Sequence, residues 1–376
     1  MTVKTHLELV ILYFLILACF THRCKSLCRF SSSENLRDGE IKGMFVFGSS
    51  LVDNGNNNFL DTKSKADYLP YGIDFPNGSS GRFTNGKNVV DLLGEQLKLP
   101  SLIPPFMDPA TKGSRIVEGV NHASGSAGIL DDTGSVAGNA TSMNQQIKNF
   151  EEVTLPDLEA QLGCKSSESL PNYIFVIGIG GNDYVFNYFL RKTFLTVGLE
   201  RFTSYLISSL SKQLENLYNL GARKFVLTTT YPIGSSPMVN LNQPNCGPCS
   251  QALKVAAAVY NIHLKSLVED IKLRMPGSNF VVVNTYDIVK DIIDNPTSKG
   301  FSDTTNACCE VKSAEQGGTG VSCERGGQVC ADRNTHVYFD GLHPSEAVNI
   351  QIATKAYASN LGSEVYPINV KQLAEL

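Results

Sequence analysis

The stretch Gly43–Asn57 reads GMFVFGSSLVDNGNN. It begins with a short apolar run that ends at Gly48, and it continues as a polar run that suits neither a strand nor a helix. Apolar runs without polar alternation are typical of strands that are covered on both faces. The stretch therefore predicts a buried strand and, directly after it, a loop that carries Ser49 and Ser50.

Similar apolar runs recur along the chain and alternate with segments of helical periodicity. Strands are predicted at 173–180, 224–230 and 279–286, with a shorter candidate near 119–123. Helices are predicted within 88–99, 206–225, 250–275 and 344–362, the last of which is expected to end the helical content. This alternation indicates a parallel sheet between layers of helices. In such sheets ligands bind at the carboxyl edge, so the residues that follow each strand are the candidates for a site.

The composition excludes several classes of protein. The chain has 376 residues, of which 42% are hydrophobic and 18% charged, with a formal net charge of -4. These values are typical of a globular protein and argue against nucleic acid or an anionic membrane as the main partner. The sequence has no internal repeat and no long linker, so we expect one domain over 43–376, preceded by a short segment over 29–42.

The N-terminus has the pattern of an export signal. An uninterrupted apolar run of 12 residues spans Leu9–Phe20. It is short for a membrane-spanning helix, which needs about 20 such residues, but it suits the core of a secretory signal. We predict a cleaved signal peptide over 1–28, with cleavage between Arg23 and Cys28; an uncleaved anchor is the alternative. The glycosylation sequons at Asn77 and Asn139 agree with secretion to the extracellular space or cell wall, without stable membrane insertion.

The cysteines also suggest an oxidising compartment. Of the ten, Cys19 and Cys24 are expected to leave with the signal. The remaining cysteines are expected to form mostly disulfides; they are Cys28, Cys164, Cys246, Cys249, Cys308, Cys309, Cys323 and Cys330. Seven of these follow Cys28, so one is either free or paired with Cys28. The CGPC run at 246–249 also has the pattern of a redox pair or half of a zinc site.

Three segments at predicted strand or helix boundaries carry reactive side chains. Ser50 follows the first strand, Asn182 follows the strand at 173–180, and DGLHP at 340–344 precedes the last helix. A serine nucleophile needs a base, the base needs an orienting carboxylate, and the oxyanion needs donors. Each segment alone also has an ordinary interpretation as a turn, a helix cap or a surface histidine. Their shared place at one sheet edge predicts acyl transfer by a serine.

These motifs resemble those of the plant secreted GDSL esterase/lipase family, within the SGNH hydrolase superfamily. FGSSLVDNGNN is similar to the family's block FGDSLxDxGNN, and NHASGSAGI at 121–129 is similar to NxASGxAGI. The run GGND at 180–183 is similar to GxND, and DGLHP is similar to DxxHP. The resemblance covers nearly all of the chain after Gly43, and the four blocks occur in the family's order.

The resemblance implies a role for individual residues. Ser50 matches the nucleophile, His343 the base, and Asp340 the acid that orients it. The oxyanion would be held by the Ser50 amide, by Asn182, and by the amide of Gly125, with Gly128 as the alternative glycine. The implied fold is a three-layer α/β/α sandwich with about five parallel strands, similar to flavodoxin. The implied activity is hydrolysis of carboxylic esters, either lipid or acylated cell-wall esters, without a metal or organic cofactor.

Two positions depart from the family pattern. Ser49 stands where the family carries the aspartate of GDSL, and Phe339 stands where it usually carries tryptophan. The aspartate is not part of the triad, so its loss leaves the chemistry possible but predicts a change in the loop's hydrogen bonding. Two alternatives to hydrolysis stay open at this point. One is an acyltransferase that uses the same triad, and the other is a secreted binding protein with a weakened site.

Overall fold

The computed structural model describes residue 28 and residues 41–242 and 246–376. The predicted signal peptide, apart from Cys28, and residues 29–40 of the predicted N-terminal segment lie outside the described residues. Within the described ranges, no helix combines the length and the apolar character that crossing a membrane requires.

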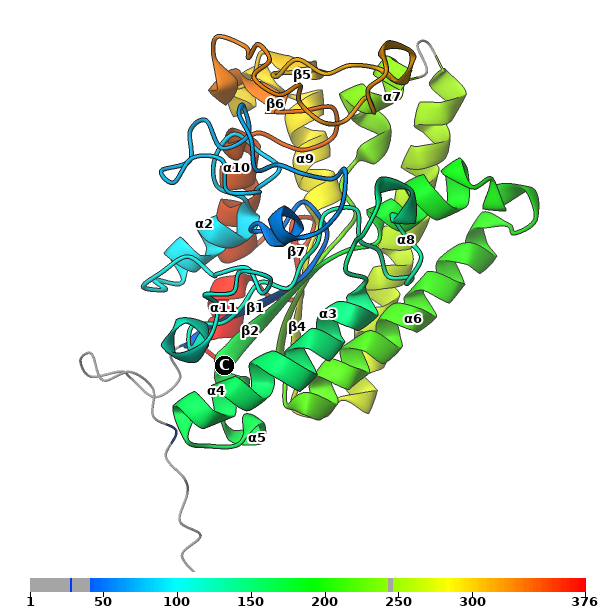
Figure 1. The fold of residues 1–376 in the computed structure, drawn as a ribbon. Coiled ribbons are helices and arrows are strands. Elements are labelled where there is room, and N and C mark those ends of the chain that lie inside the picture. The colour runs from blue at the N-terminus through cyan, green and yellow to red at the C-terminus, as the bar shows by residue number, and fades with distance from the viewer. Residues whose placement is uncertain (1–27, 29–40, 243–245) are drawn as a thin grey trace, which may run out of the picture.

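A five-stranded sheet forms the centre of the molecule (Figure 1). Its order is β1-β2-β3-β4-β7, in which β1 to β4 are parallel and β7 is antiparallel to β4. The strands are β1 (Gly43–Gly48), β2 (Tyr173–Gly178), β3 (Lys224–Thr228), β4 (Asn279–Val283) and β7 (Val365–Tyr366). The mostly parallel α/β fold predicted from the sequence is therefore confirmed.

The fifth strand differs from the prediction. The segment near 119–123 lies beside β1, where the Val46 N–H donates to the Val120 carbonyl and the His122 N–H donates to the Val46 carbonyl. It forms isolated parallel bridges at Asn121 but no continuous strand. The fifth strand of the sheet is instead β7, which pairs with the opposite edge in the antiparallel sense. Strand β7 contains two residues, too few for a hydrophobic pattern to reveal.

Helices cover both faces of the sheet. One face is covered by α3 (Met143–Asn149), α4 (Leu155–Leu162), α6 (Leu199–Leu220) and α8 (Gly247–Arg274). The other is covered by α2 (Val89–Gln96), α9 (Thr285–Asp294), α10 (Glu346–Ala358) and α11 (Val370–Ala374). The four predicted helices correspond to α2, α6, α8 and α10, but α11 follows α10, so the helix within 344–362 is not the last. The remaining α-helices are the short α5 (Ser166–Ser169) and α7 (Pro237–Asn242), and the remaining strands are β5 (Asp303–Ala307) and β6 (His336–Tyr338), which form a two-stranded sheet.

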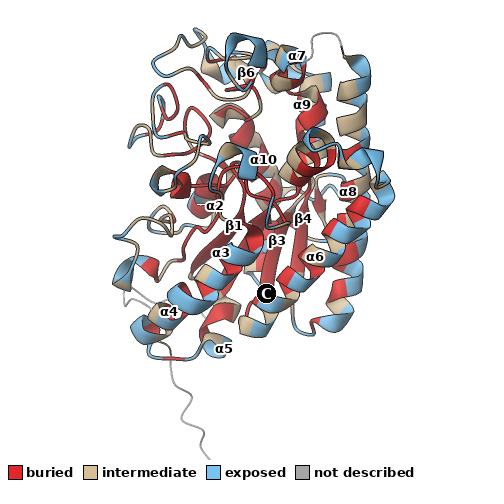
Figure 2. Ribbon diagram, turned by 45° about the vertical axis from the view of Figure 1, so that its right-hand side comes forward, coloured by how far each residue is buried: buried red, intermediate tan, exposed pale blue. Residues whose placement is uncertain are grey.

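Alternate residues of β1 enter different cores. Phe45 and Phe47 pack in the core beneath α3, α4, α6 and α8. Met44 and Val46 pack in the core beneath α2, α9, α10 and α11. Figure 2 shows the resulting arrangement, with buried strands between helices that are exposed on their outer sides. Burial on both faces explains why β1 lacks polar alternation.

Four disulfides join the eight cysteines that the structure describes. The pairs are Cys28–Cys164, Cys246–Cys249, Cys308–Cys330 and Cys309–Cys323. Of the two possibilities for the odd cysteine, pairing with Cys28 is the one observed. The CGPC run is an internally paired disulfide, so its sulfurs are not available as a zinc half-site in this form.

Candidate active site

Ser50 lies in a tight turn at the carboxyl end of β1. The turn is held by the Ser49 N–H, which donates to the Gly178 carbonyl at 3.0 Å, and by the Val52 N–H, which donates to the Ser49 carbonyl at 3.1 Å. A glycine is required at the preceding position, because a Cβ on Gly48 would lie 2.4 Å from the Gly178 carbonyl oxygen at the end of β2. Among the described residues, the Ser50 N–H has no acceptor.

The loop between β6 and α10 brings a histidine and an aspartate to Ser50. The His343 Nε2 atom lies 2.8 Å from the Ser50 Oγ atom, and the His343 Nδ1 atom lies 2.7 Å from Asp340 Oδ2. The other carboxylate oxygen, Asp340 Oδ1, accepts the backbone N–H groups of Leu342 and His343 at 2.8 and 2.7 Å. With Asp340 accepting from Nδ1, the free Nε2 lone pair faces the serine hydroxyl.

The three side chains are buried, with exposed fractions of 7% for Ser50, 3% for His343 and 0% for Asp340. Two aromatic residues enclose them. The Tyr71 hydroxyl donates to Asp340 Oδ2 at 2.6 Å, and the Phe83 ring centre lies 5.0 Å from the His343 ring centre. Burial raises the pKa of Tyr71 well above its usual value, so this hydroxyl keeps its proton for the carboxylate. No sequence signal pointed to Tyr71.

Asn182 follows β2 and is fixed by the loop that contains the second motif. Its Nδ2 group donates to the Ala127 carbonyl at 2.9 Å, which leaves the second amide hydrogen for another acceptor. Its neighbour Asp183 is fully buried and accepts from the Ile129 and Leu130 N–H groups at 2.9 and 3.0 Å. Burial raises the pKa of Asp183 to about 6, against the lowering effect of its donors. Asp183 therefore joins this loop to the start of the helical turn at Asp183–Leu190.

Gly125 lies beside the site but differs from the sequence expectation. A Cβ on Gly125 would lie 2.7 Å from the Phe83 ring, and Phe83 packs on His343. The Gly125 N–H, however, donates to Asp53 Oδ2 at 3.1 Å, so it is already engaged. The N–H of the alternative glycine, Gly128, has no acceptor among the described residues.

Asp53 is a structural residue to which the sequence analysis gave no role. Its Oδ1 atom accepts from the Gly55 and Asn56 N–H groups at 2.8 and 2.7 Å, in addition to the bond from Gly125. Burial raises its pKa to about 6. The residue stands in the first motif, so its position was visible in the sequence, but its partner Gly125 lies 72 positions away.

The two departures from the family pattern both lie at the site. Ser49 is 9% exposed, and its backbone forms the turn described above. Phe339 is fully buried, and its ring centre lies 5.8 Å from that of Tyr71. Its N–H donates to the His343 carbonyl at 2.9 Å, which closes the loop that carries Asp340.

The predicted sequon residues, Asn77 and Asn139, are both exposed. Two groups of residues in the described part of the chain have metal-ligand atoms close together, namely Cys308, Cys330 and His336, and Cys28, Cys164 and Glu168. In both groups the cysteines are paired in disulfides, so they offer no thiolate to a metal.

A mostly parallel α/β sheet with a serine, a histidine and an aspartate in hydrogen-bonding contact at its carboxyl edge is the arrangement of the serine hydrolases. Comparison with known proteins defines the family. The model of the GDSL-like Lipase/Acylhydrolase family matches residues 44–356. The chain belongs to this family, which confirms the resemblance seen in the motifs and places the protein among the carboxylic ester hydrolases.

Curated relatives from Arabidopsis thaliana match almost end to end. GDSL esterase/lipase At1g29670 is 37% identical over 369 residues, which cover 96% of this chain and 97% of the relative. GDSL esterase/lipase At4g16230 is 40% identical over 356 residues, covering 92% and 95%. Among solved structures, LAE5, an alpha/beta hydrolase enzyme from the metagenome of Lake Arreo, Spain, aligns with a TM-score of 0.37 at 14% identity, covering 83% of this chain and 91% of LAE5.

Proposed function

We propose that this protein hydrolyses carboxylic esters through Ser50, His343 and Asp340. The observation that supports this most directly is the continuous chain of contacts from the Ser50 hydroxyl through the His343 ring to the Asp340 carboxylate, at 2.8 and 2.7 Å. A surface histidine would be exposed, and an ordinary turn would not place its serine hydroxyl within hydrogen-bonding distance of a buried histidine. The family relationship supports the same chemistry.

In the proposed mechanism, His343 Nε2 takes the Ser50 proton while Oγ attacks the ester carbonyl. Asp340 stabilises the imidazolium, and the Tyr71 hydroxyl bonded to the same carboxylate oxygen helps to hold the carboxylate in place. The alcohol leaves with the proton from His343, and a water molecule then attacks the acyl-enzyme by the reverse path. In each half of the reaction His343 Nε2 first accepts a proton, from Ser50 and then from water, and afterwards donates it, to the leaving alcohol and then back to Ser50.

The oxyanion is assigned to the Ser50 N–H and the Asn182 side chain. The first has no acceptor among the described residues, and the second has one amide hydrogen not used by Ala127. Loss of one such donor typically lowers kcat by about 10²–10³. Gly125 was the expected third donor, but its N–H is engaged by Asp53, so Gly128 becomes the preferred candidate.

The assignment is tested with a fluorescent organophosphonate, which reacts covalently with activated serines, and with p-nitrophenyl esters of graded chain length. Ser50→Ala is expected to abolish labelling and to lower kcat by about 10⁶, as removal of a triad serine does elsewhere. Ser49→Ala is the matched control, because it removes the neighbouring hydroxyl from the same turn. It is expected to keep both the covalent labelling and the kcat of wild type. Labelling that survives in Ser50→Ala would contradict the assignment, and folded wild-type protein that neither labels nor turns over would contradict hydrolysis itself.

We also propose that the protein is secreted to the extracellular space or cell wall and glycosylated at Asn77 and Asn139. The four disulfides and the exposed sequons support this. The Cys28–Cys164 pair supports a cleavage site before Cys28, since cleavage after it would remove Cys28 from the disulfide. We therefore place cleavage between Arg23 and Cys28 on the N-terminal side of Cys28, which N-terminal sequencing of secreted protein would check.

A further inference from the structure

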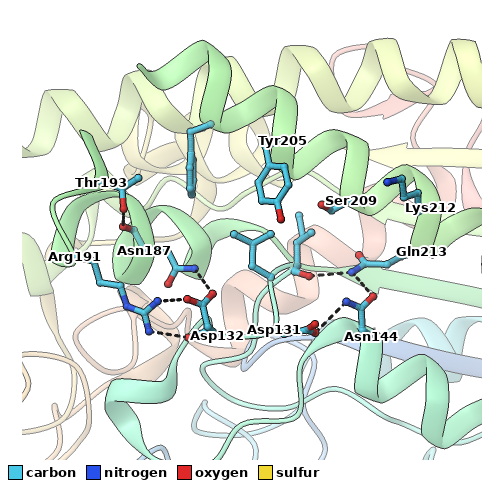
Figure 3. A pocket seen from close by; sticks show the side chains of 13 residues that line it. Asp131, Asp132, Asn144, Asn187, Arg191, Thr193, Tyr205, Ser209, Lys212 and Gln213 are labelled. Atoms are coloured by element: carbon cyan, nitrogen blue, oxygen red, sulfur yellow. Dashed lines mark hydrogen bonds and ion pairs between the residues drawn. The ribbon is translucent and has the colours of Figure 1, made fainter. Parts of the chain in front are cut away.

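A groove of about 530 Å³ lies beside α6 (Figure 3), and Ser50 is not among the residues that line it. It lies between helix α6, the loop that follows the second motif, the start of α3 and the turn after Asn182. Its volume is in the range of about 300–1,000 Å³ that is typical of small-molecule sites. Its lining includes Ile129, Asp131, Asn187, Tyr205, Ser209 and Gln213.

Two buried amide oxygens in the groove wall have no hydrogen-bond donor. Gln213 uses its Nε2 group on the Ile129 carbonyl and on Asn144, both at 2.9 Å, and its Oε1 atom has no partner among the described residues. The Asn187 Nδ2 group donates to Asp132 and Thr133, and the Asn187 Oδ1 atom also has no hydrogen-bond partner among the described residues. The exposed fractions of Gln213 and Asn187 are 2% and 5%. Buried acceptors of this kind cost free energy unless a water or a ligand supplies a donor.

The groove also presents an aromatic face beside these polar groups. Tyr205 is 60% exposed although it is a large aromatic residue, and Figure 3 shows its side chain directed from α6 into the groove. Tyr205, Ser209 and Gln213 are spaced four residues apart, so they share one side of the helix. The buried side chains of Ile129 and Phe202 add apolar lining. An aromatic ring next to hydroxyl and amide groups suits a ligand that has apolar C–H faces and many O–H donors.

The charges in the groove balance. Asp132 forms an ion pair with Arg191, while Asp131 accepts from Ser142 and Asn144 at 2.7 and 3.0 Å. With Lys212, the lining carries two acidic and two basic side chains. A strongly charged ligand would find no excess of opposite charge here. We therefore propose that the groove binds neutral oligosaccharide, with a sugar ring against Tyr205 and sugar hydroxyls on the exposed Asp131 carboxylate and the Ser209 hydroxyl.

The groove is connected to the active site through Asp183. Its carboxylate accepts the N–H groups of Ile129 and Leu130 in the groove wall, and it is the neighbour of Asn182. The binding itself does not rest on the proposed ester hydrolysis. That the bound polysaccharide also carries the ester rests on that proposed function, and it points to esters carried by a polysaccharide as the substrate class.

Binding is tested in Ser50→Ala protein by calorimetric titration with xylotetraose and cellotetraose, so that the result does not depend on hydrolysis. We expect saturable binding of at least one of them. Tyr205→Ala should weaken the binding by about tenfold, equivalent to ~1.4 kcal/mol. Tyr205→Phe should bind with nearly the affinity of the Tyr205 protein, because the ring is retained. Ile262→Ala is the control: it truncates a side chain that is 67% exposed on α8 and does not line the groove.

Several results would overturn the proposal. They are the absence of heat with both neutral tetrasaccharides, binding that Tyr205→Ala leaves unchanged, and tighter binding of tetragalacturonate, which would show a charged ligand. Flotation of the protein with phosphatidylcholine vesicles, lost in Tyr205→Ala, would instead assign this face to a lipid surface. If wild-type protein lacks esterase activity but the Ser50→Ala titration shows the expected pattern, the groove stands and the proposed hydrolysis does not.

Discussion

At the scale of single residues, His122 contributes to stability as a neutral ring. It is 2% exposed, it stacks on Phe47 with ring centres 5.3 Å apart, and Phe106 and Phe150 lie at 4.8 and 5.9 Å. Its Nε2 atom lies 3.2 Å from the Thr154 hydroxyl, whereas its buried Nδ1 atom has no partner among the described residues. Burial lowers its pKa from 6.5 to about 3. Protonation of the His122 ring is therefore unfavourable while the ring is buried in the folded protein.

The pH dependence of stability follows from this shift. Between pH 6.5 and 3 the unfolded chain binds a proton at His122 that the folded chain does not, so the free energy of unfolding falls as the pH decreases through this interval. The slope from this one group is about 1.4 kcal/mol per pH unit. In urea titrations at pH 7 and pH 5, wild type should lose about 2 kcal/mol more than His122→Phe. Equal losses in the two proteins would contradict the role of His122, since the effects of Asp53 and Asp183 are common to both.

The residues of the site differ in how visible they are in the sequence. Ser50, Asn182, Asp340 and His343 follow predicted strands or precede a predicted helix in short motifs, so their meeting at one edge follows from the topology. Tyr71 lies 269 positions from Asp340, in a loop without a pattern, and only the folded chain shows their contact. The hydrogen bond from the Gly125 N–H to Asp53 could not be predicted for the same reason. Spacing in the sequence does not determine which of several nearby acceptors a backbone N–H bonds to.

At the scale of elements, no helix prediction covered α3, α4 and α9, and the helix predicted within 206–225 begins earlier, at Leu199. The predicted strand at 279–286 ends at Val283, because Asn284 caps α9 by accepting the Asp287 N–H. Strand β7 is too short to show a period, and its pairing with β4 depends on the chain returning from α10. The segment at 119–123 contains suitable residues and is hydrogen-bonded to β1, but it pairs only through isolated bridges at Asn121 and does not form a continuous strand. Strands β1 to β4, which are buried on both faces, were predicted because their continuous apolar pattern is set by the two cores.

Asp183 makes a prediction at this scale, because it connects the turn after β2 to the loop over 129–133. Its carboxylate accepts two backbone N–H groups and the Thr133 hydroxyl, the last at 2.7 Å. Asp183→Asn replaces an acceptor oxygen by an N–H₂ group that faces donors, so the loop that holds Asn182 through Ala127 should shift. We expect kcat for p-nitrophenyl acetate to fall by about 10- to 100-fold with a smaller change in KM, since displacement of an oxyanion donor affects the transition state.

Thr133→Val is the matched control for this change, because it removes the hydroxyl donor and leaves the two backbone donors of Asp183 in place. Its kcat should fall less than that of Asp183→Asn. If Asp183→Asn lowers the melting temperature but leaves kcat as in wild type, the residue is structural and does not position Asn182.

At the scale of the whole molecule, the disulfides differ in the length of chain that they close. Cys28 and Cys164 are 136 residues apart, whereas Cys246 and Cys249 are 3 residues apart. Where a disulfide acts mainly by restricting the unfolded chain, its stabilisation grows with the logarithm of the loop length. The Cys28–Cys164 pair also joins the segment before β1 to the end of α4, so it fastens the beginning of the described chain to the helical layer beneath the sheet.

We therefore expect Cys28→Ser/Cys164→Ser to lose about 3 kcal/mol more of the free energy of unfolding than Cys246→Ser/Cys249→Ser, the difference that the two loop lengths give. Both double variants remove one disulfide and leave no unpaired cysteine from it, which makes them a matched pair. Denaturant unfolding of the two proteins under oxidising conditions measures the difference. Equal destabilisation would show that local contacts at each disulfide, and not restriction of the unfolded chain, determine how much each contributes.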